Sequence, residues 1–135
     1  MKILLPSKAQ CKRVYTLLSI FYDTNKSEKG TIENFTTFNH ALTILCSFYN
    51  INKPNRIRFR RSFRDKECVG MCYESGNIDL LYPYDYQGDF TLSYCRQWIG
   101  VFFHEFGHYY LWSKAEEKAD EYESKMLNCC CKKRK

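Results

Sequence analysis

The sequence predicts an α+β fold in which two helices precede a small antiparallel sheet and two further helices follow it. The spacing of apolar residues is helical at first, changes to strict alternation near residue 56, and becomes helical again after residue 91. The chain has 135 residues, of which 44% are hydrophobic and 27% are charged, so we expect one domain with one core. This composition excludes a wholly disordered chain.

The first two predicted helices cover about residues 8–23 and 32–49. Ser7 is a suitable N-cap for the first helix, because its hydroxyl can accept a hydrogen bond from the backbone of the first turn. The apolar residues of the second helix fall on a single stripe: Phe35, Phe38, Leu42, Leu45 and Tyr49. A loop follows over residues 50–55.

Three strands are predicted after this loop. In the first, Ile57 and Phe59 alternate with arginines, which indicates one buried face and one basic face. The second covers about residues 68–73 and the third residues 78–82, and the turn between them contains Gly76, which can supply a positive φ. We therefore expect an antiparallel meander with strand 78–82 at its edge.

Charge gives only a weak indication of a partner. The chain carries 21 Lys and Arg residues against 15 Asp and Glu residues, a net charge of +6. This excess permits an acidic partner but does not require one. The densest basic run is formed by Arg56, Arg58, Arg60, Arg61 and Arg64. We interpret this run as the solvated outer face of the sheet, and nucleic acid as an unfavoured partner, because no aromatic residue interleaves on that face for base stacking.

The last two predicted helices cover about residues 92–112 and 114–128. Their candidate N-caps are Asp89 or Thr91 for the first and Ser113 for the second. The first contains Gly100 and Gly107, seven residues apart on one face. Because glycine weakens a helix, we expect another element to pack very closely against this face.

An H-E-x-x-H motif, His104-Glu105-Phe106-Gly107-His108, lies inside the helix 92–112. Residues i and i+4 share one helix face, so both imidazoles can reach one metal ion, for which zinc is the expected identity. Glu105 can then take a proton from a water molecule that the metal activates. The ordinary alternative is a pair of core histidines beside a salt-bridged Glu105. We disfavour it because a buried, unpaired glutamate is costly without a metal.

A catalytic zinc site also needs a third protein ligand and an open fourth position. Glu116 is the first candidate, with Glu117 as its substitute. Glu116 and Asp120 are four residues apart on one helix face, so Asp120 can accept a hydrogen bond from a ligand imidazole. An alternative role for Glu116 is a capping box with Ser113, in which it would bond only to the backbone of its own helix.

H-E-F-G-H at 104–108 followed by E-x-x-A-D at 116–120 resembles gluzincin-type metallopeptidases, and among these the ImmA/IrrE-like family. The resemblance covers about residues 98–127 and departs from the family at Glu123, where members carry alanine. It implies a minimal zincin-like domain with an active-site helix and a following ligand helix.

By this resemblance His104, His108 and Glu116 are zinc ligands and Glu105 is the catalytic base. The implied activity is site-specific cleavage of a regulatory protein, such as a helix-turn-helix repressor. We expect the substrate to add as a strand along 78–82. Candidate oxyanion partners are Tyr82, Tyr84, Tyr86, Tyr109 and Tyr110. The alternatives are a catalytically inactive zincin-fold binding module and a metal-free interaction protein tethered to a membrane.

Localisation is inferred from the cysteines and from the N-terminal residues. The first residues lack the apolar stretch of a signal peptide, and no apolar run reaches the roughly 20 residues of a membrane span. We therefore expect a cytoplasmic protein whose 8 cysteines are mostly reduced. The predicted domain is 1–128, and 129–135 is a Cys-rich basic tail. Membrane contact through this tail is the less favoured interpretation.

Overall fold

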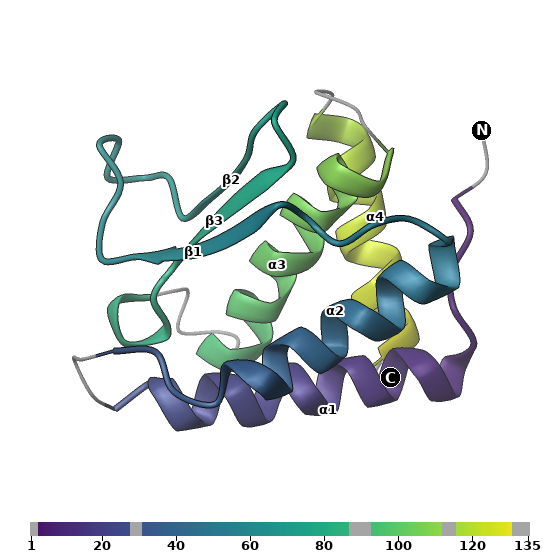
Figure 1. Ribbon diagram of the computed structural model, residues 1–135, viewed down its shortest axis with the longest axis horizontal. Helices are drawn as coiled ribbons and strands as arrows, with labels where there is room; N and C mark the ends of the chain where they lie inside the picture. The colour runs from purple at the N-terminus through teal and green to yellow at the C-terminus, as the bar shows by residue number, and fades with distance from the viewer. Residues whose placement is uncertain (1–2, 28–30, 87–92, 112–115, 131–135) are drawn as a thin grey trace.

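The computed structural model describes residues 3–27, 31–86, 93–111 and 116–130 (Figure 1). Within these ranges the elements are α1 (Lys8–Asn25), α2 (Phe35–Tyr49), β1 (Arg56–Arg60), β2 (Gly70–Cys72), β3 (Asn77–Leu81), the 3-10 turn η1 (Pro83–Asp85), α3 (Tyr94–Leu111) and α4 (Glu116–Cys130). The predicted α+β class and the predicted order of helices and strands are confirmed, with small shifts at the ends of the elements. None of the described helices is both long and apolar enough to cross a membrane.

Side-chain hydrogen bonds cap the start of α1 and hold the connection from α1 to α2. Ser7 Oγ accepts a hydrogen bond from the backbone of Gln10 at 3.1 Å, and Gln10 Oε1 accepts one from the backbone of Ser7 at 3.2 Å. This reciprocal capping box confirms Ser7 as the N-cap of α1. The buried amide of Asn25, at the end of α1, bonds to both the N–H and the C=O of Glu33 at 2.9 Å. This pair of bonds joins the end of α1 to the start of α2.

The sheet differs from the predicted antiparallel meander. Its strand order is β1-β3-β2, with β1 parallel to β3 and β2 antiparallel to β3. The sheet is therefore mixed, and β3 is its central strand, so the prediction that 78–82 forms the edge was wrong. The chain between β1 and β2 is long enough to cross to the far side of β3. Alternation of apolar residues reports which face of a strand is buried, but it does not report the neighbours or the direction of that strand.

The core lies where α1, α2 and α3 meet the sheet. Figure 1 shows α3 between the sheet and α4, with α1 and α2 side by side across the lower part of the molecule. Phe38 of α2 has its ring centroid 5.1 Å from that of Phe21 and 5.3 Å from that of Phe102. The indole N–H of Trp98 donates to the carbonyl of Leu81 at 2.8 Å, which fixes α3 against the end of β3. This packing gives the H-E-x-x-H helix a rigid support.

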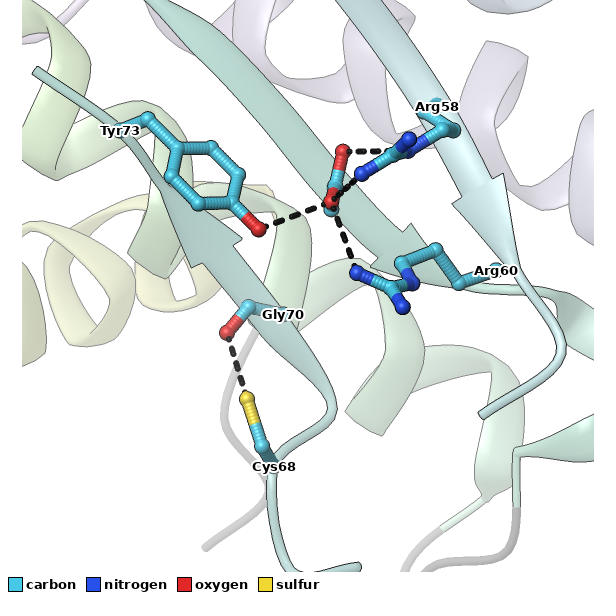
Figure 2. Close-up of polar contacts among 6 residues, drawn as sticks. Arg58, Arg60, Cys68, Gly70 and Tyr73 are labelled. Atoms are coloured by element: carbon cyan, nitrogen blue, oxygen red, sulfur yellow. Dashed lines mark hydrogen bonds and ion pairs between the residues drawn. The ribbon is translucent and has the colours of Figure 1, made fainter. Parts of the chain in front are cut away.

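The other face of the sheet contains a buried carboxylate that the sequence analysis missed. Figure 2 shows Arg58, Arg60 and Tyr73 converging on one carboxylate, that of Asp79, which is 0% exposed. The contacts are 2.8 Å to Arg58, 3.5 Å to Arg60 and 2.9 Å to the Tyr73 hydroxyl. Burial raises the pKa of Asp79, but the bonds from Arg58, Tyr73 and Arg60 outweigh it and leave the pKa below its usual value. The predicted basic face is thus partly neutralised from within the sheet.

The C-terminal helix continues beyond the predicted domain boundary at 128. Cys129 and Cys130 are the last residues of α4, and the Cys130 thiol is buried and donates to the carbonyl of Cys11 at 3.1 Å. The first two residues of the predicted tail therefore belong to the folded domain, because they pack on α1. The remainder of that tail, 131–135, lies outside the described residues.

Candidate metal centre

Helix α3 places the two motif histidines together. His104 and His108 are four residues apart, and their ring centroids lie 5.0 Å from each other with the ring planes at 79°. Their side chains are only 17% and 13% exposed. Both imidazoles therefore lie on one face of α3, as the i, i+4 spacing predicts.

Helix α4 brings a carboxylate to this pair. Glu116 Oε1 lies 2.7 Å from His104 Nε2 and 3.6 Å from His108 Nε2. One donor atom from each of the three residues lies within 4.8 Å of the others, so the group could hold a metal ion. Two imidazole nitrogens and one carboxylate oxygen are donors that suit a divalent transition metal. The Glu116 side chain is 72% exposed, so the group opens towards solvent on that side.

The two alternatives for the third ligand have different outcomes. In the described part of the chain a second set of residues, His104, Asp120 and Glu123, could also hold a metal ion. Glu117, the substitute ligand, is exposed on α4 and belongs to neither set. The capping box of Glu116 with Ser113 falls on residues 112–115, which lie outside the described residues, as do the candidate caps Asp89 and Thr91. The contact between Glu116 and His104 favours Glu116 over Glu117 as the ligand.

Two glycines allow α4 to lie close to α3. A Cβ at Gly107 would lie 3.1 Å from Cβ of Tyr122, and a Cβ at Gly100 would lie 2.7 Å from Oε2 of Glu123. The expectation that another element packs closely on this face of α3 is confirmed. A larger residue at Gly107 would press on the buried Tyr122 and separate the two helices, and with them the histidines from Glu116. At Gly100 it would instead displace the carboxylate of Glu123.

Two more carboxylates of α4 surround the other nitrogen of His104. Asp120 Oδ1 lies 3.1 Å from His104 Nδ1, and Glu123 Oε1 lies 3.3 Å from the same atom. The geometry allows the role predicted for Asp120, whereas the sequence analysis missed Glu123. The signal that could have found Glu123 is its spacing, because residues 116, 120 and 123 fall on one helix face. The hydrogen bond to Glu123 is the largest cause that raises the pKa of His104 to about 9, although burial lowers it.

Glu105 lies on the side of α3 that faces strand β2. Its side chain is 7% exposed, and a Cβ added at Gly70 would lie 3.0 Å from its Cγ and 3.1 Å from its Oε2. Burial is the main cause that raises the pKa of Glu105 to about 7, and the carboxylates of Glu116 and Glu123 contribute in the same direction. The positive charges of the two motif histidines oppose this rise. A carboxylate with such a pKa can both accept and release a proton near neutral pH.

Two of the five candidate tyrosines make contacts with α2 or the loop after it. The Tyr109 hydroxyl donates to the carbonyl of Asn52 at 2.5 Å, and the Tyr110 ring stacks on Tyr49 with centroids 3.8 Å apart. The other three, Tyr82, Tyr84 and Tyr86, lie in or beside η1. The assistance of any tyrosine in catalysis therefore stays a prediction.

Comparison of the chain with protein-family models, curated proteins and solved structures found no match. The interpretation of the site therefore depends on the positions and chemistry of its own residues.

Proposed function

We propose that the chain is a zinc-dependent endopeptidase whose active site is built on α3 and α4. The observation that carries the proposal is the convergence of His104, His108 and Glu116, with donor atoms within 4.8 Å of one another, beside the buried Glu105. Three protein ligands and a neighbouring general base are the set of residues that zinc-dependent hydrolysis needs.

Each residue has a defined task in this proposal. His104, His108 and Glu116 would hold the zinc ion. When bound, zinc supplies Lewis acidity, which polarises the scissile carbonyl and lowers the pKa of a water molecule. The Glu105 carboxylate takes the proton from the attacking water and passes it to the leaving amine. Its side chain is buried beside the two histidines, on the side of α3 that faces β2.

The substrate is proposed to bind as an extended strand along β2. β2 pairs with β3 on one side, and among the described strands it has no partner on its other side. It also contacts Glu105 at Gly70, so a peptide paired with this edge would pass beside the catalytic base. The central position of β3 excludes strand 78–82 from this role. A regulatory protein such as a helix-turn-helix repressor remains the proposed substrate class, supported by the resemblance of the motifs.

Metal content tests the proposal directly. Protein purified without chelator should contain about one zinc per chain, whereas His108→Ala and Glu116→Ala should contain little. Glu117→Ala is the matched control, since it removes the adjacent carboxylate of the same helix, and it should retain zinc. Folded wild-type protein that takes up no zinc, even after zinc is added, would overturn the proposal in favour of the metal-free interaction protein.

The catalytic step needs a separate test. Glu105→Gln keeps the size of the side chain but removes its ability to accept a proton, so it should retain zinc and lose cleavage of an unfolded protein substrate. Zinc bound by the wild-type protein without any cleavage that Glu105→Gln abolishes would instead favour the inactive binding module. Circular dichroism of each variant shows whether the fold is retained.

A further inference from the structure

His104 is contacted by carboxylates of α4 at both ring nitrogens. Nε2 faces Glu116, while Nδ1 lies 3.1 Å from Asp120 and 3.3 Å from Glu123. A histidine that ligates a metal through one nitrogen usually donates the N–H of the other nitrogen to a carboxylate, which fixes the ring in its ligating orientation. Two carboxylates compete for that role here, and they differ in their surroundings.

Exposure separates the two carboxylates. The side chain of Asp120 is 68% exposed, so water competes for its hydrogen bond and screens its charge. The side chain of Glu123 is 32% exposed. A hydrogen bond to a less hydrated carboxylate is stronger, because the effective dielectric constant around it is lower.

The two oxygens of Glu123 have different neighbours. Oε1 faces Nδ1 of His104, whereas Oε2 occupies the space beside Gly100, where a Cβ would lie only 2.7 Å away. The methyl Cδ1 of Leu127 lies 3.3 Å from the same position. One oxygen of the carboxylate therefore lies against α3 at Gly100, and any side chain at residue 100 would displace it. A glycine inside a helix costs about 1 kcal/mol relative to alanine, so its presence in α3 needs a compensating reason of this kind.

We propose that Glu123 is a positioning residue of the metal centre, which holds the His104 ring through Nδ1, and that Gly100 provides the space for its carboxylate. The inference rests on the proposed metal centre, but it does not depend on the reaction carried out there. It also gives a role to the residue at which the chain departs from the ImmA/IrrE-like pattern.

Zinc affinity, measured by competition with a chromophoric chelator, tests the role of Glu123. Glu123→Gln should weaken zinc binding about 10–100-fold, the usual effect of removing a carboxylate behind a ligand histidine. Glu121→Gln is the matched control, because it removes the same charge from an exposed position of the same helix, and its affinity should stay at the wild-type value. Asp120→Asn should have a smaller effect than Glu123→Gln. In the cobalt-substituted protein, the d–d spectrum of Glu123→Gln should differ from that of the wild type, which a purely structural role would not produce.

A double-mutant cycle tests the role of Gly100. Gly100→Ala should weaken zinc binding as Glu123→Ala does, and the double variant should bind no more weakly than Glu123→Ala alone, since the methyl group no longer has a carboxylate to displace. Independent losses that add in the double variant would contradict the role of Gly100.

The hydrogen bond between Glu123 and His104 can also be tested without zinc. In the metal-free protein, nitrogen-15 NMR of labelled histidine should show a slowly exchanging Nδ1 proton on His104 that is lost in Glu123→Ala. Equal zinc affinity in Glu123→Gln and Glu121→Gln, with this proton unchanged, would overturn the inference while leaving the endopeptidase intact. Normal zinc binding without peptide cleavage would overturn the endopeptidase and leave the role of Glu123 intact. A wild-type protein that binds no zinc would overturn both.

Discussion

Gly107→Ala places a methyl group in the contact between α3 and α4, directly before the second motif histidine. The new Cβ would lie 3.1 Å from Cβ and 3.2 Å from Cδ2 of Tyr122, closer than the roughly 3.5–4.0 Å of a favourable carbon–carbon contact. Tyr122 cannot move aside easily, because it is fully buried and its hydroxyl accepts a hydrogen bond from Tyr49 at 3.1 Å. Relief of the contact therefore requires α4 to move away from α3 by a few tenths of an ångström.

Two opposing effects determine the stability of this variant. Alanine is favoured over glycine in a helix by about 1 kcal/mol, whereas overpacking a core costs about 1–3 kcal/mol. We expect a net loss of up to about 2 kcal/mol in the free energy of unfolding. The effect on the metal centre should be clearer, because metal–ligand distances tolerate changes of only about 0.2 Å and Glu116 moves together with α4. We expect zinc affinity to fall at least about tenfold.

Urea denaturation measures the free energy of unfolding, and competition with a chelator measures zinc affinity. Ser47→Ala, on the exposed side of α2, is the control: it improves helix propensity without a packing conflict, so both quantities should be retained or slightly improved. A Gly107→Ala protein that is more stable than the wild type and binds zinc equally well would refute the argument that close packing of α3 and α4 sets the site.

Three further predictions concern the sheet, the first helix and the metal. Asp79→Asn should lower the free energy of unfolding by about 2 kcal/mol at pH 7, since it removes the charge of a buried carboxylate that accepts hydrogen bonds from Arg58, Arg60 and Tyr73. Because the folded-state pKa of Asp79 lies below its unfolded value, this stabilisation is present above about pH 4 and is lost as the pH falls through the lowered pKa. The difference in unfolding free energy between variant and wild type, measured by urea titration, should therefore be smaller at pH 3 than at pH 7. An equal difference at both pH values would contradict this prediction. Ser7→Ala should cost about 1 kcal/mol in the same assay by removing the capping box of α1, and no change would argue against that cap. Added zinc at about 100 times its Kd should stabilise the wild type by about 2.7 kcal/mol, EDTA should reverse the effect, and His108→Ala should show neither response in a thermal melt.

Much of the local structure could be predicted because it depends on neighbouring residues. The capping box at Ser7, the positive φ of Gly76 and the pairing of His104 with His108 follow from backbone geometry over a few residues. The close approach of a second element to α3 could also be inferred from Gly107, since a helix rarely retains a glycine without a packing reason.

The contacts that the sequence analysis missed join residues far apart in the chain. Alternation identified the strands, but the order β1-β3-β2 depends on how the chain crosses between β1 and β2. The bond of Asp79 to Arg58, the approach of Glu123 to Gly100 and the position of Glu105 beside Gly70 follow from that tertiary arrangement.

The sequence by itself therefore determined the helices, the Ser7 cap of α1 and the spacing that brings two imidazoles to one face. Only the tertiary structure decided which strands form the edges of the sheet, which carboxylates reach His104 and which glycine lies against Glu105. The physical reason is that local periodicity is set by backbone geometry, whereas these choices arise from many weak packing and hydrogen-bonding contacts that act together across the fold.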